Sequence, residues 1–410
     1  MKTLLMLTKF YPFGTGEAFI ESEMPIVADK FDKVIIVACD VDGGITKQRY
    51  IPENVKMVRI NSKCKAKDLK KAVTYFLKPS NELKDEFTYC KNVKQKLFAC
   101  YFESKSHRIY ESIKEKLDVK ALTKDEVTLY SYWLFTTARV GLMLKKNLGE
   151  AVRLSITRAH RYDLYNERNS LNYLPMRRML LDGYDKICPC SDDGTKYLKK
   201  GYPEYEQKIM TALLGTIDHG MNKQSDDGVF RVVSCSRMES VKRIDKLIDS
   251  LALLDVKGYS IEWTHIGGGL LERELKEKAK RLLKHVSFIF KGNMLNTDVM
   301  KLYKMYSFDL FVNVSSSEGL PVSIMEAISF GIPVIATDVG GTSEIVFDSE
   351  TGYLIPENFT NEQLAEKIEQ FVTGKINYTY LRTRTREIWE QRFRAANNYE
   401  KLCKNIMQLG

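Results

Sequence analysis

The chain has 410 residues, of which 44% are hydrophobic and 28% are charged, and its net charge is +10. This length is enough for two domains of about 200 residues each. No apolar run approaches the roughly 20 residues of a membrane-spanning helix, and the first strand-like run, Thr3–Leu7, is too short for a signal-peptide core. We therefore expect a cytoplasmic protein. The eight cysteines have no framework spacing, so we expect reduced thiols.

The positive charge is concentrated between Lys56 and Lys96, where twelve Lys or Arg residues accompany four acidic residues. The same segment has apolar residues at helical spacing, such as Leu69, Val73 and Leu77. A basic amphipathic stretch can lie on an anionic membrane surface, and a pair of ordinary helices with a solvated basic face explains the pattern equally well. No nucleic-acid-binding motif accompanies the charge, so we expect no nucleic-acid partner.

Strand-like apolar runs alternate with helix-like segments along the chain, which is typical of parallel α/β sheets. In the first half we predict strands over Thr3–Thr8, Lys33–Cys39, Val127–Ser131, Val152–Thr157 and Lys186–Cys190. In the second half we predict them over Phe230–Ser236, Tyr259–Ile266, Val286–Lys291, Leu310–Val314 and Pro333–Ala336. A polar, glycine-bearing stretch, Gly215–Gly228, separates the two sets. The sequence therefore predicts two doubly wound, Rossmann-like α/β domains with a boundary near residues 210–228 and ligands at the carboxyl ends of the strands.

Residues 10–19, FYPFGTGEAF, place Gly14-Thr15-Gly16 between the first strand and a helix expected to begin near Glu17. Two glycines in this position often surround a phosphate. A dinucleotide-binding fingerprint needs a third glycine, where this chain has Phe19. The pattern is compatible with two interpretations: this loop forms one half of a phosphate site, or it is a simple turn.

The most informative stretch follows the strand Leu310–Val314 and has the sequence SSSEGLPVSIMEAISFGIPVIAT. Pro321 in the first helical turn predicts a helix whose free N–H groups, at about residues 319–323, favour an anion. Glu326 lies in the apolar part of this helix, where a carboxylate needs hydrogen-bond donors. A sugar diol would supply two such donors.

The spacing of Glu318 and Glu326, with the string around them, resembles the EX7E signature of retaining glycosyltransferases of family 4, which have the GT-B fold. The resemblance implies two Rossmann-like domains that face a central cleft. It also implies that Glu318 contacts the donor sugar and that Glu326 holds the ribose hydroxyls of the nucleotide. The donor sugar or phosphate would further contact the backbone at Gly319, Leu320, Pro321 and Val322, with Pro321 giving position and no N–H.

Arg237 follows the predicted strand Phe230–Ser236, and Lys242 precedes a helix expected over Ile244–Leu254. Two fixed cations at a strand end would stabilise the charge that grows on a nucleoside diphosphate leaving group. The segment is similar to the Gly-Arg-x-x-x-x-Lys-Gly string of the family, with Ser236 and Arg243 in place of the glycines. The resemblance implies catalytic roles for Arg237 and Lys242 and predicts no metal and no cofactor.

Two further segments of the second half resemble donor-site segments of the family. The backbone of Gly292, Asn293 and Met294 would contact the nucleotide base. The turn Gly267-Gly268-Gly269 would support the donor site structurally.

On the acceptor side, TRAHRYDLY (residues 157–165) resembles a family string in which the histidine faces the donor sugar across the cleft, which implies a catalytic role for His160. Asp163 could orient His160, bind acceptor hydroxyls or cap a helix. The resemblance also brings the loop with Gly14 and Gly16 close to the donor phosphate. Glu17 would begin a helix, with an acceptor contact as its alternative role.

Residues 386–410 have helical spacing, and the resemblance implies that this last helix packs back on the N-terminal domain. The predicted domains are residues 1–212 with 386–410 on the acceptor side and 213–385 on the donor side. An ordinary terminal helix on the second domain is the alternative.

Together these features predict a retaining glycosyltransferase that moves a hexose from a nucleotide sugar to a glycan or lipid-linked acceptor. FYPFGTGEAF and TRAHRYDLY most resemble bacterial capsule, exopolysaccharide and lipopolysaccharide transferases. The alternatives are a catalytically silent nucleotide-sugar-binding protein and a GT-B epimerase or phosphorylase. We expect a cytoplasmic location, with residues 56–96 as the candidate contact with the inner membrane face.

Overall fold

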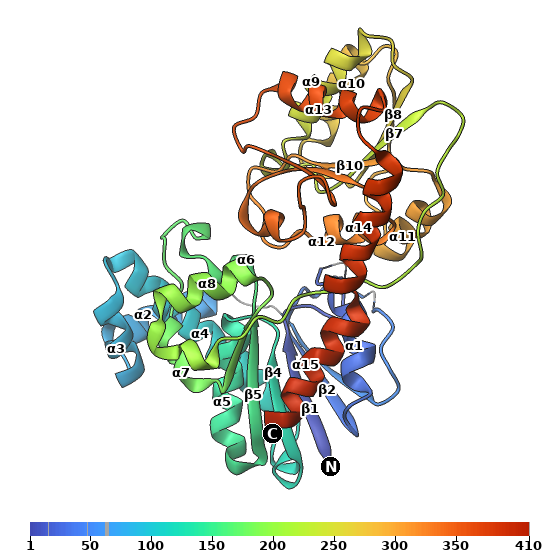
Figure 1. Ribbon diagram of the computed structural model, residues 1–410. Helices are drawn as coiled ribbons and strands as arrows, with labels where there is room; N and C mark the ends of the chain where they lie inside the picture. Colours follow the sequence, from blue (N-terminus) through green and yellow to red (C-terminus); the bar gives the residue numbers. More distant parts are fainter. Residues whose placement is uncertain (15, 47, 62–64, 410) are drawn as a thin grey trace. The chain divides into compact units, whose positions relative to one another are not determined.

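Two six-stranded parallel sheets organise the chain, in a computed structural model that describes residues 1–14, 16–46, 48–61 and 65–409 (Figure 1). One sheet belongs to a unit formed by Met1–Leu213 together with the residues from Tyr399 onward, and the other belongs to the unit Leu214–Asn398. Helices alternate with the strands in both units. The predicted fold class, two Rossmann-like α/β domains, is confirmed.

The N-terminal unit has the strand order β3-β2-β1-β4-β5-β6. Its strands are β1 (Lys2–Thr8), β2 (Lys33–Val41), β3 (Val55–Asn61), β4 (Glu126–Ser131), β5 (Val152–Ala159) and β6 (Lys186–Pro189). Strand β3 was not predicted from the sequence, because it lies at the sheet edge within the basic segment and has exposed residues on both sides of its pleat. Its pairing with β2 is nevertheless parallel and begins at Val34 opposite Val55.

Alternate residues of β1 show why helices cover both faces of this sheet. Leu5 and Leu7 belong to one apolar cluster, whereas Leu4 and Met6 belong to another. Since successive side chains of a strand point to opposite faces, each face has its own buried core. The covering helices are α1 (Ile20–Ala28), α4 (Val93–Lys116), α5 (Thr136–Leu148), α7 (Arg177–Gly183), α8 (Asp192–Gly201) and α15 (Ala395–Leu409).

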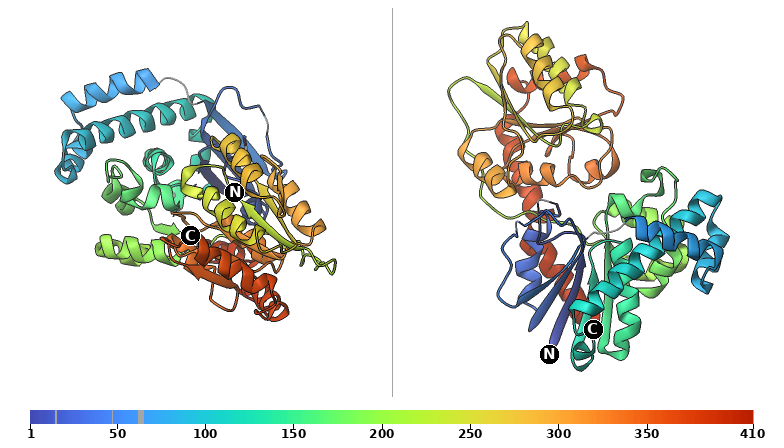
Figure 2. Two further views of the ribbon diagram at one scale, coloured as in Figure 1. Left: turned by 90° about the horizontal axis from the view of Figure 1, so that it is seen from above. Right: turned by 180° about the vertical axis from the view of Figure 1, so that it is seen from behind.

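The basic segment, Lys56–Lys96, forms most of β3, the helices α2 (Lys65–Leu77) and α3 (Asn81–Tyr89), and the start of the long helix α4. Helix α2 packs along α4, as the view from above in Figure 2 shows. A bidentate ion pair fixes this packing, because Arg108 of α4 contacts the two oxygens of Asp68 of α2 at 2.8 and 3.0 Å. Residues 62–64 of the basic segment lie outside the described residues.

The C-terminal unit has the strand order β12-β11-β10-β7-β8-β9. Its strands are β7 (Phe230–Cys235), β8 (Ile261–Ile266), β9 (Ser287–Phe290), β10 (Leu310–Asn313), β11 (Val334–Thr337) and β12 (Gly352–Ile355), and its helices are α9 (Ile244–Asp255), α10 (Glu272–Leu282), α11 (Asn296–Met305), α12 (Val322–Ser329), α13 (Asn361–Val372) and α14 (Tyr378–Arg392). The edge strand β12 was not predicted. It begins at Gly352, where a Cβ atom would lie 1.8 Å from the carbonyl oxygen of Val334, so only glycine fits.

The C-terminal helix differs from the expectation for residues 386–410. The segment is divided between α14 and α15, and the residues up to Asn398 belong to the C-terminal unit. Trp389 of α14 is fully buried and donates to Thr216 Oγ1 at 2.7 Å, which holds α14 on that unit. Only the part from Tyr399 onward belongs to the N-terminal unit, where Leu402 and Ile406 join its apolar core.

None of the helices in the described part of the chain has both the length and the apolar character needed to cross a bilayer. The seven cysteines at described positions form no disulfide with one another, whereas Cys64 lies outside the described residues.

Candidate functional site

Glu318 lies in the loop between β10 and α12, at the carboxyl edge of the second sheet. Its side chain is largely buried, and its Oε1 lies 2.6 Å from Nζ of Lys242. The same oxygen accepts a hydrogen bond from Nδ2 of Asn313, the last residue of β10, at 3.2 Å. The structure therefore brings together Glu318 and Lys242, which lie 76 positions apart in the sequence.

The backbone on both sides of Glu318 is held by Gly340 and Gly341, which follow β11. A Cβ atom at Gly340, whose φ is +55°, would lie 2.1 Å from the carbonyl oxygen of Glu318. The N–H of Gly341 donates to the carbonyl oxygen of Gly319 at 2.9 Å. Sequence reasoning missed both residues, although a glycine pair three residues after the end of a strand is a signal for a close approach of two backbones.

Arg243 holds the strand end that leads into the Glu318 loop. Its guanidinium donates to the carbonyl oxygens of Val314 at 2.7 Å, Ser315 at 3.1 Å and Glu357 at 2.7 Å. Its φ is +49°, in the left-handed region that favours glycine. Arg243 stands where the family string has glycine. It thus keeps a glycine-like backbone conformation and adds three side-chain hydrogen bonds.

Arg237 takes a different position from Lys242. Its side chain is 72% exposed and pairs with Glu239 at 2.7 Å. The loop that carries it packs against the glycine turn after β8, because a Cβ at Gly267 would lie 1.9 Å from the carbonyl oxygen of Ser236. The N–H of Met238 also donates to the carbonyl oxygen of Gly268 at 2.9 Å. The glycine turn therefore supports the Arg237 loop, and only Lys242 of the two predicted cations contacts Glu318.

Glu326 is a buried carboxyl group on α12. Asn296 Nδ2, at the start of α11, donates to its Oε1 at 2.6 Å. Burial raises the pKa of Glu326 to about 7, and the hydrogen bond from Asn296 opposes this rise. A carboxyl group in this state gains by accepting further hydrogen bonds, as ribose hydroxyls would provide.

The N-terminus of α12 lies on the same loop. Pro321 precedes the helix, its carbonyl oxygen accepts from Ile324 at 3.1 Å, and no side chain caps the helix. The first N–H groups, at Val322 and Ser323, have no acceptor within the helix and favour a negative charge. Gly319 and Leu320 connect this terminus directly to Glu318.

Gly292 and Asn293 lie against the glycine turn after β8, and Met294 follows them half-buried. The carbonyl oxygen of Gly292 accepts from the N–H of Gly267 at 2.9 Å, and Oδ1 of Asn293 accepts from the N–H of Gly268 at 2.9 Å. The Asn293 side chain is thus engaged in holding the turn. The expected contact of this backbone with a base stays a prediction.

His160 lies in the N-terminal unit, directly after β5, and is 8% exposed. Its ring packs among the rings of Phe19, Tyr132 and Trp133, with centroid distances of 5.5, 5.2 and 4.6 Å. Neither ring nitrogen has a hydrogen-bond partner among the described residues. Burial, and secondarily the charge of Arg158, lowers the pKa of His160 well below its ordinary value, so the imidazole is neutral at pH 7.

Asp163 caps the short helix α6 (Arg161–Leu164). Its Oδ1 accepts from the N–H of His160 at 2.6 Å and its Oδ2 accepts from the N–H of Leu134 at 2.5 Å, while the side chain is fully buried. Burial raises the pKa of Asp163 to about 7. Of the roles considered for Asp163, the geometry gives the helix cap, which also fixes the backbone of His160. A contact with acceptor hydroxyls is not available to a side chain buried in this way.

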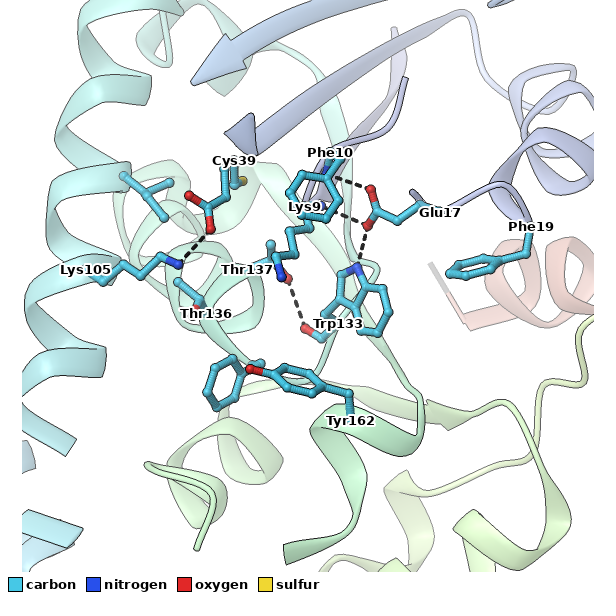
Figure 3. Close-up of a pocket in the computed structure, with 13 residues that line it drawn as sticks. Lys9, Phe10, Glu17, Phe19, Cys39, Lys105, Trp133, Thr136, Thr137 and Tyr162 are labelled. Carbon is cyan, nitrogen blue, oxygen red and sulfur yellow. Dashed lines mark hydrogen bonds and ion pairs between the residues drawn. The ribbon is translucent and has the colours of Figure 1, made fainter. Parts of the chain in front are cut away.

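Glu17 does not begin a helix, because α1 starts at Ile20 and Glu17 has a φ of +60°. Its carboxylate accepts from the N–H groups of Lys9, Phe10 and Tyr11 at 3.0, 2.6 and 2.6 Å, and from Nε1 of Trp133 at 2.5 Å (Figure 3). The Glu17 carboxylate thus holds the conformation of the loop after β1 through these hydrogen bonds. This is a structural role that the sequence interpretation did not consider for Glu17.

The glycines of this loop are held by Arg49. Its Nε donates to the carbonyl oxygen of Gly14 at 3.1 Å, and its Nη2 donates to that of Gly16 at 2.8 Å. Gly14 has a φ of +67°, which favours glycine in this turn. Thr15 between them lies outside the described residues. The expected approach of this loop to a donor phosphate stays a prediction.

A pocket of about 270 Å³ opens beside Glu17, at the carboxyl ends of β1, β2 and β4 (Figure 3). Phe19 and Trp133, which pack on His160, also line this pocket. Its other lining residues combine aromatic and polar side chains, namely Lys9, Phe10, Cys39, Asp40, Lys105, Ile109, Phe135, Thr136, Thr137 and Tyr162. Aromatic walls with a few polar groups suit a sugar ring.

Over the described ranges, no three His, Cys, Asp or Glu side chains gather in a way that could hold a metal ion. The expectation that neither a metal nor a cofactor takes part stays a prediction.

Comparison with known proteins relates this geometry to a family. Residues 221–388, which include Arg237, Lys242, Glu318 and Glu326, match the family described as Glycosyl transferases group 1. The chain is 24% identical over 241 residues to the UDP-N-acetylglucosamine--peptide N-acetylglucosaminyltransferase GtfA subunit of Streptococcus pneumoniae, with 58% of this chain and 46% of GtfA covered. It is 27% identical over 174 residues to the amylovoran biosynthesis glycosyltransferase AmsK of Erwinia amylovora, with 40% and 41% covered.

The chain spans about half the length of the curated relatives it matches. Among solved structures, it is similar to Anabaena Alr3699/HepE in complex with UDP and glucose, with a TM-score of 0.66 and 15% identity over 98% of this chain and 99% of that one. Such a likeness extends over both units and concerns the fold. Residues 221–388 therefore match the Glycosyl transferases group 1 family, and the chain as a whole shares its fold of two Rossmann-like domains with glycosyltransferases of the GT-B type.

Proposed function

We propose that this protein is a retaining glycosyltransferase of family 4 that moves a hexose from a nucleotide sugar to a glycan or lipid-linked acceptor in bacterial surface polysaccharide biosynthesis. The observation that carries the proposal is the contact between Lys242 and Glu318, at the carboxyl edge of the sheet in the region that matches the family. The UDP and glucose bound to HepE and the role of AmsK in amylovoran biosynthesis support the donor class and the setting.

The proposal gives a role to each polar group of the candidate site in the C-terminal unit. Lys242 neutralises the donor diphosphate, Glu318 contacts hydroxyls of the sugar, and Glu326 accepts hydrogen bonds from the ribose diol. The free N–H groups at the start of α12 add a fixed positive potential. Arg237, which is exposed on its loop, turns from Glu239 to the diphosphate when the donor binds.

In the transfer step the bond between the anomeric carbon and the diphosphate oxygen breaks. The acceptor hydroxyl oxygen bonds to the anomeric carbon on the face from which the diphosphate leaves, and its proton passes to a phosphate oxygen. No enzyme nucleophile and no metal take part. Lys242 acts mainly in the transition state, because the charge on the leaving group grows there.

The pocket beside Glu17 is the acceptor site in this proposal. Its aromatic walls would stack on a sugar ring, and the amino group of Lys9 and the hydroxyl groups of Thr136 and Thr137 would bind its hydroxyls. His160 packs on two of its walls and stays neutral, so it offers hydrogen bonding without adding charge.

We also propose that the basic segment, residues 56–96, contacts the anionic inner face of the membrane. Leu69 and Leu77 of α2 are 58% and 73% exposed and lie on the same helix face as Val73, which is also exposed. Lysines flank this apolar ridge. A half-exposed apolar face beside cations is the arrangement of a helix that lies in a membrane interface.

The membrane contact is tested by flotation with vesicles that contain anionic lipid. The variant L69Q/L77Q should lose flotation, whereas V256Q/L270Q, which changes two exposed apolar residues of the C-terminal unit, should float like the unchanged protein. Binding should weaken as salt is raised. Equal flotation of both variants would contradict the contact.

The transfer itself is tested by incubating the protein with a panel of nucleotide sugars and measuring release of the nucleoside diphosphate. K242A should lose turnover, whereas K301A, which removes an exposed lysine of the same unit, should keep it. Donor binding without turnover by the unchanged protein, across the panel and with added glycan acceptors, would instead identify the catalytically silent binding protein.

A further inference from the structure

A second, larger pocket of about 630 Å³ lies in the N-terminal unit, away from the residues assigned above. It is built by the turn between α3 and α4, the segment around η3 (Asn166–Arg168) and α7, and the end of α8. These helices lie on one side of the unit (Figure 1). Its lining residues are polar or amphipathic apart from Leu174 and Gly201, and they are Glu86, Tyr89, Lys91, Gln95, Asn166, Asn172, Tyr173, Leu174, Arg177, Arg178, Tyr197, Lys200, Gly201 and Tyr202.

Arg177 is the buried charge of this pocket. It is 4% exposed, and its Nη2 donates to the carbonyl oxygen of Asp163 at 2.5 Å. Its Nη1 has no hydrogen-bond partner among the described residues. Burial is the main cause that lowers the pKa of Arg177. The carboxyl groups of Asp163 and Glu86 act on Arg177 electrostatically, but neither forms an ion pair or hydrogen bond with it among the described residues. An anionic ligand would supply the hydrogen-bond acceptor that the buried Nη1 lacks.

Further cations surround Arg177. Lys91 and Lys200 line the pocket, are exposed, and have no carboxylate partner in the part of the chain that the structure describes. Arg178 pairs with Glu204, and its guanidinium lies 5.2 Å from the ring centre of Tyr89 and 5.4 Å from that of Tyr202. Four cations thus line one pocket.

Glu86 is the only acid that lines the pocket, among the residues described. Its Oε1 already accepts hydrogen bonds from Tyr173 and from the N–H of Met176, the latter at 2.9 Å. Burial raises the pKa of Glu86, which favours its neutral form. The pocket therefore keeps a positive character in spite of this carboxyl group.

The remaining lining groups suit a polyhydroxylated ligand. Four tyrosines provide ring faces and hydroxyls, and Asn166 and Asn172 provide amides. Rings stack on sugars, amides bind hydroxyls, and guanidinium and ammonium groups bind carboxylates and phosphates. We propose that this pocket binds an anionic saccharide, meaning a sugar that carries a carboxylate or a phosphate, at a site separate from the nucleotide-sugar site.

The test is isothermal titration calorimetry of the full-length chain with four probes: glucuronate, glucose 6-phosphate, glucose and inorganic phosphate. An anionic sugar should bind about tenfold more tightly than glucose or inorganic phosphate, because it uses both the cations and the tyrosine and amide groups. The glucuronate and glucose 6-phosphate titrations distinguish a carboxylate from a phosphate. The proposal would be overturned if neither glucuronate nor glucose 6-phosphate bound more tightly than both glucose and inorganic phosphate.

Matched lysine variants locate the binding. K91Q/K200Q should weaken binding of the anionic sugar about tenfold, whereas K94Q/K196Q, which removes two exposed lysines of α4 and α8 that do not line the pocket, should leave this binding unchanged. Arg177 is left intact, because its bond to Asp163 also supports the His160 turn. UDP-glucose binding should be equal in both variants, so failure here is distinguishable from failure of the proposed transfer activity. Equal loss in both variants would overturn the proposal.

Discussion

Glu17 and Glu318 occupy corresponding places in the two units, since each lies in a loop at the carboxyl edge of a parallel sheet. The carboxylate of Glu17 accepts four hydrogen bonds, three of them from the backbone of its own loop. Glu318 contacts one lysine and one amide, both through Oε1. The first carboxylate is used to fold a loop, whereas the second keeps capacity for a ligand. The number and kind of partners therefore distinguish two residues that the sequence places alike.

The largest effect is expected for E318Q, which removes the charge of the carboxylate that we propose contacts the donor sugar and keeps its shape. We expect turnover of the nucleotide sugar to fall by about 100-fold or more, as for the loss of a group that acts in the transition state. The free energy of unfolding in urea should change by only about 1 kcal/mol, because the amide oxygen of glutamine still accepts hydrogen bonds from Lys242 and Asn313. A loss of stability that accounts for the loss of turnover would contradict the distinction.

E17Q should have the opposite effect to E318Q, because it should lower stability and leave donor binding unchanged. A neutral amide accepts through one oxygen only, so buried N–H donors of the loop lose their acceptor, at a cost of about 1–3 kcal/mol. We expect this loss in the free energy of unfolding, measured by urea denaturation, while the affinity of the folded protein for the nucleotide sugar stays unchanged. A stable E17Q protein would show that the four hydrogen bonds do not hold the loop.

The variant R243A distinguishes two possible roles of Arg243: support of the Glu318 loop and direct contact with the donor. Removing three hydrogen bonds from a charged group should cost about 1–2 kcal/mol of stability. Turnover should fall less than in E318Q, because the carboxylate itself remains. A variant as inactive as E318Q but fully stable would place Arg243 at the donor rather than behind the loop.

The smallest effect concerns Glu326, whose pKa is raised to about 7 by burial. Donor hydroxyls bind the ionised form better, so donor affinity should rise about tenfold from pH 6 to pH 8. Since the folded-state pKa lies above the unfolded value of 4.5, stability falls as pH rises from 4.5 to about 7 and stays low above that. E326Q should therefore be more stable than the unchanged protein at pH 8, bind the donor more weakly and lose the pH dependence of donor affinity. Calorimetric titrations at both pH values check donor affinity, and urea denaturation at pH 8 checks stability.

Much of this arrangement could be predicted from the sequence, because it depends on local pattern. Buried strands and the helix start at Pro321 are visible as apolar runs and turn residues, and parallel topology then gathers Lys242 and Glu318 at one edge. The edge strand β3 was missed because charged residues interrupt its apolar residues, and β12 was missed because it offers only the three apolar residues Tyr353, Leu354 and Ile355.

The partners of side chains could not be predicted in the same way. The four hydrogen bonds to the Glu17 carboxylate depend on Trp133, which lies 116 positions away, and on the positive φ of Glu17, which no sequence pattern specifies. Arg237 belongs to the same motif as Lys242, yet its side chain pairs with Glu239. The division of the C-terminal segment depends on the contact of Trp389 with Thr216, which is a property of the folded unit.

The placement of α2 and α3 has a consequence for how such proteins diversify. These helices join the edge strand β3 to α4, and they bear the exposed apolar ridge and part of the cationic pocket. Glu318, Lys242 and Glu326 belong to the other unit. If both proposals hold, an insertion or exchange between β3 and α4 would alter the membrane and saccharide contacts and leave the residues proposed to bind the donor unchanged.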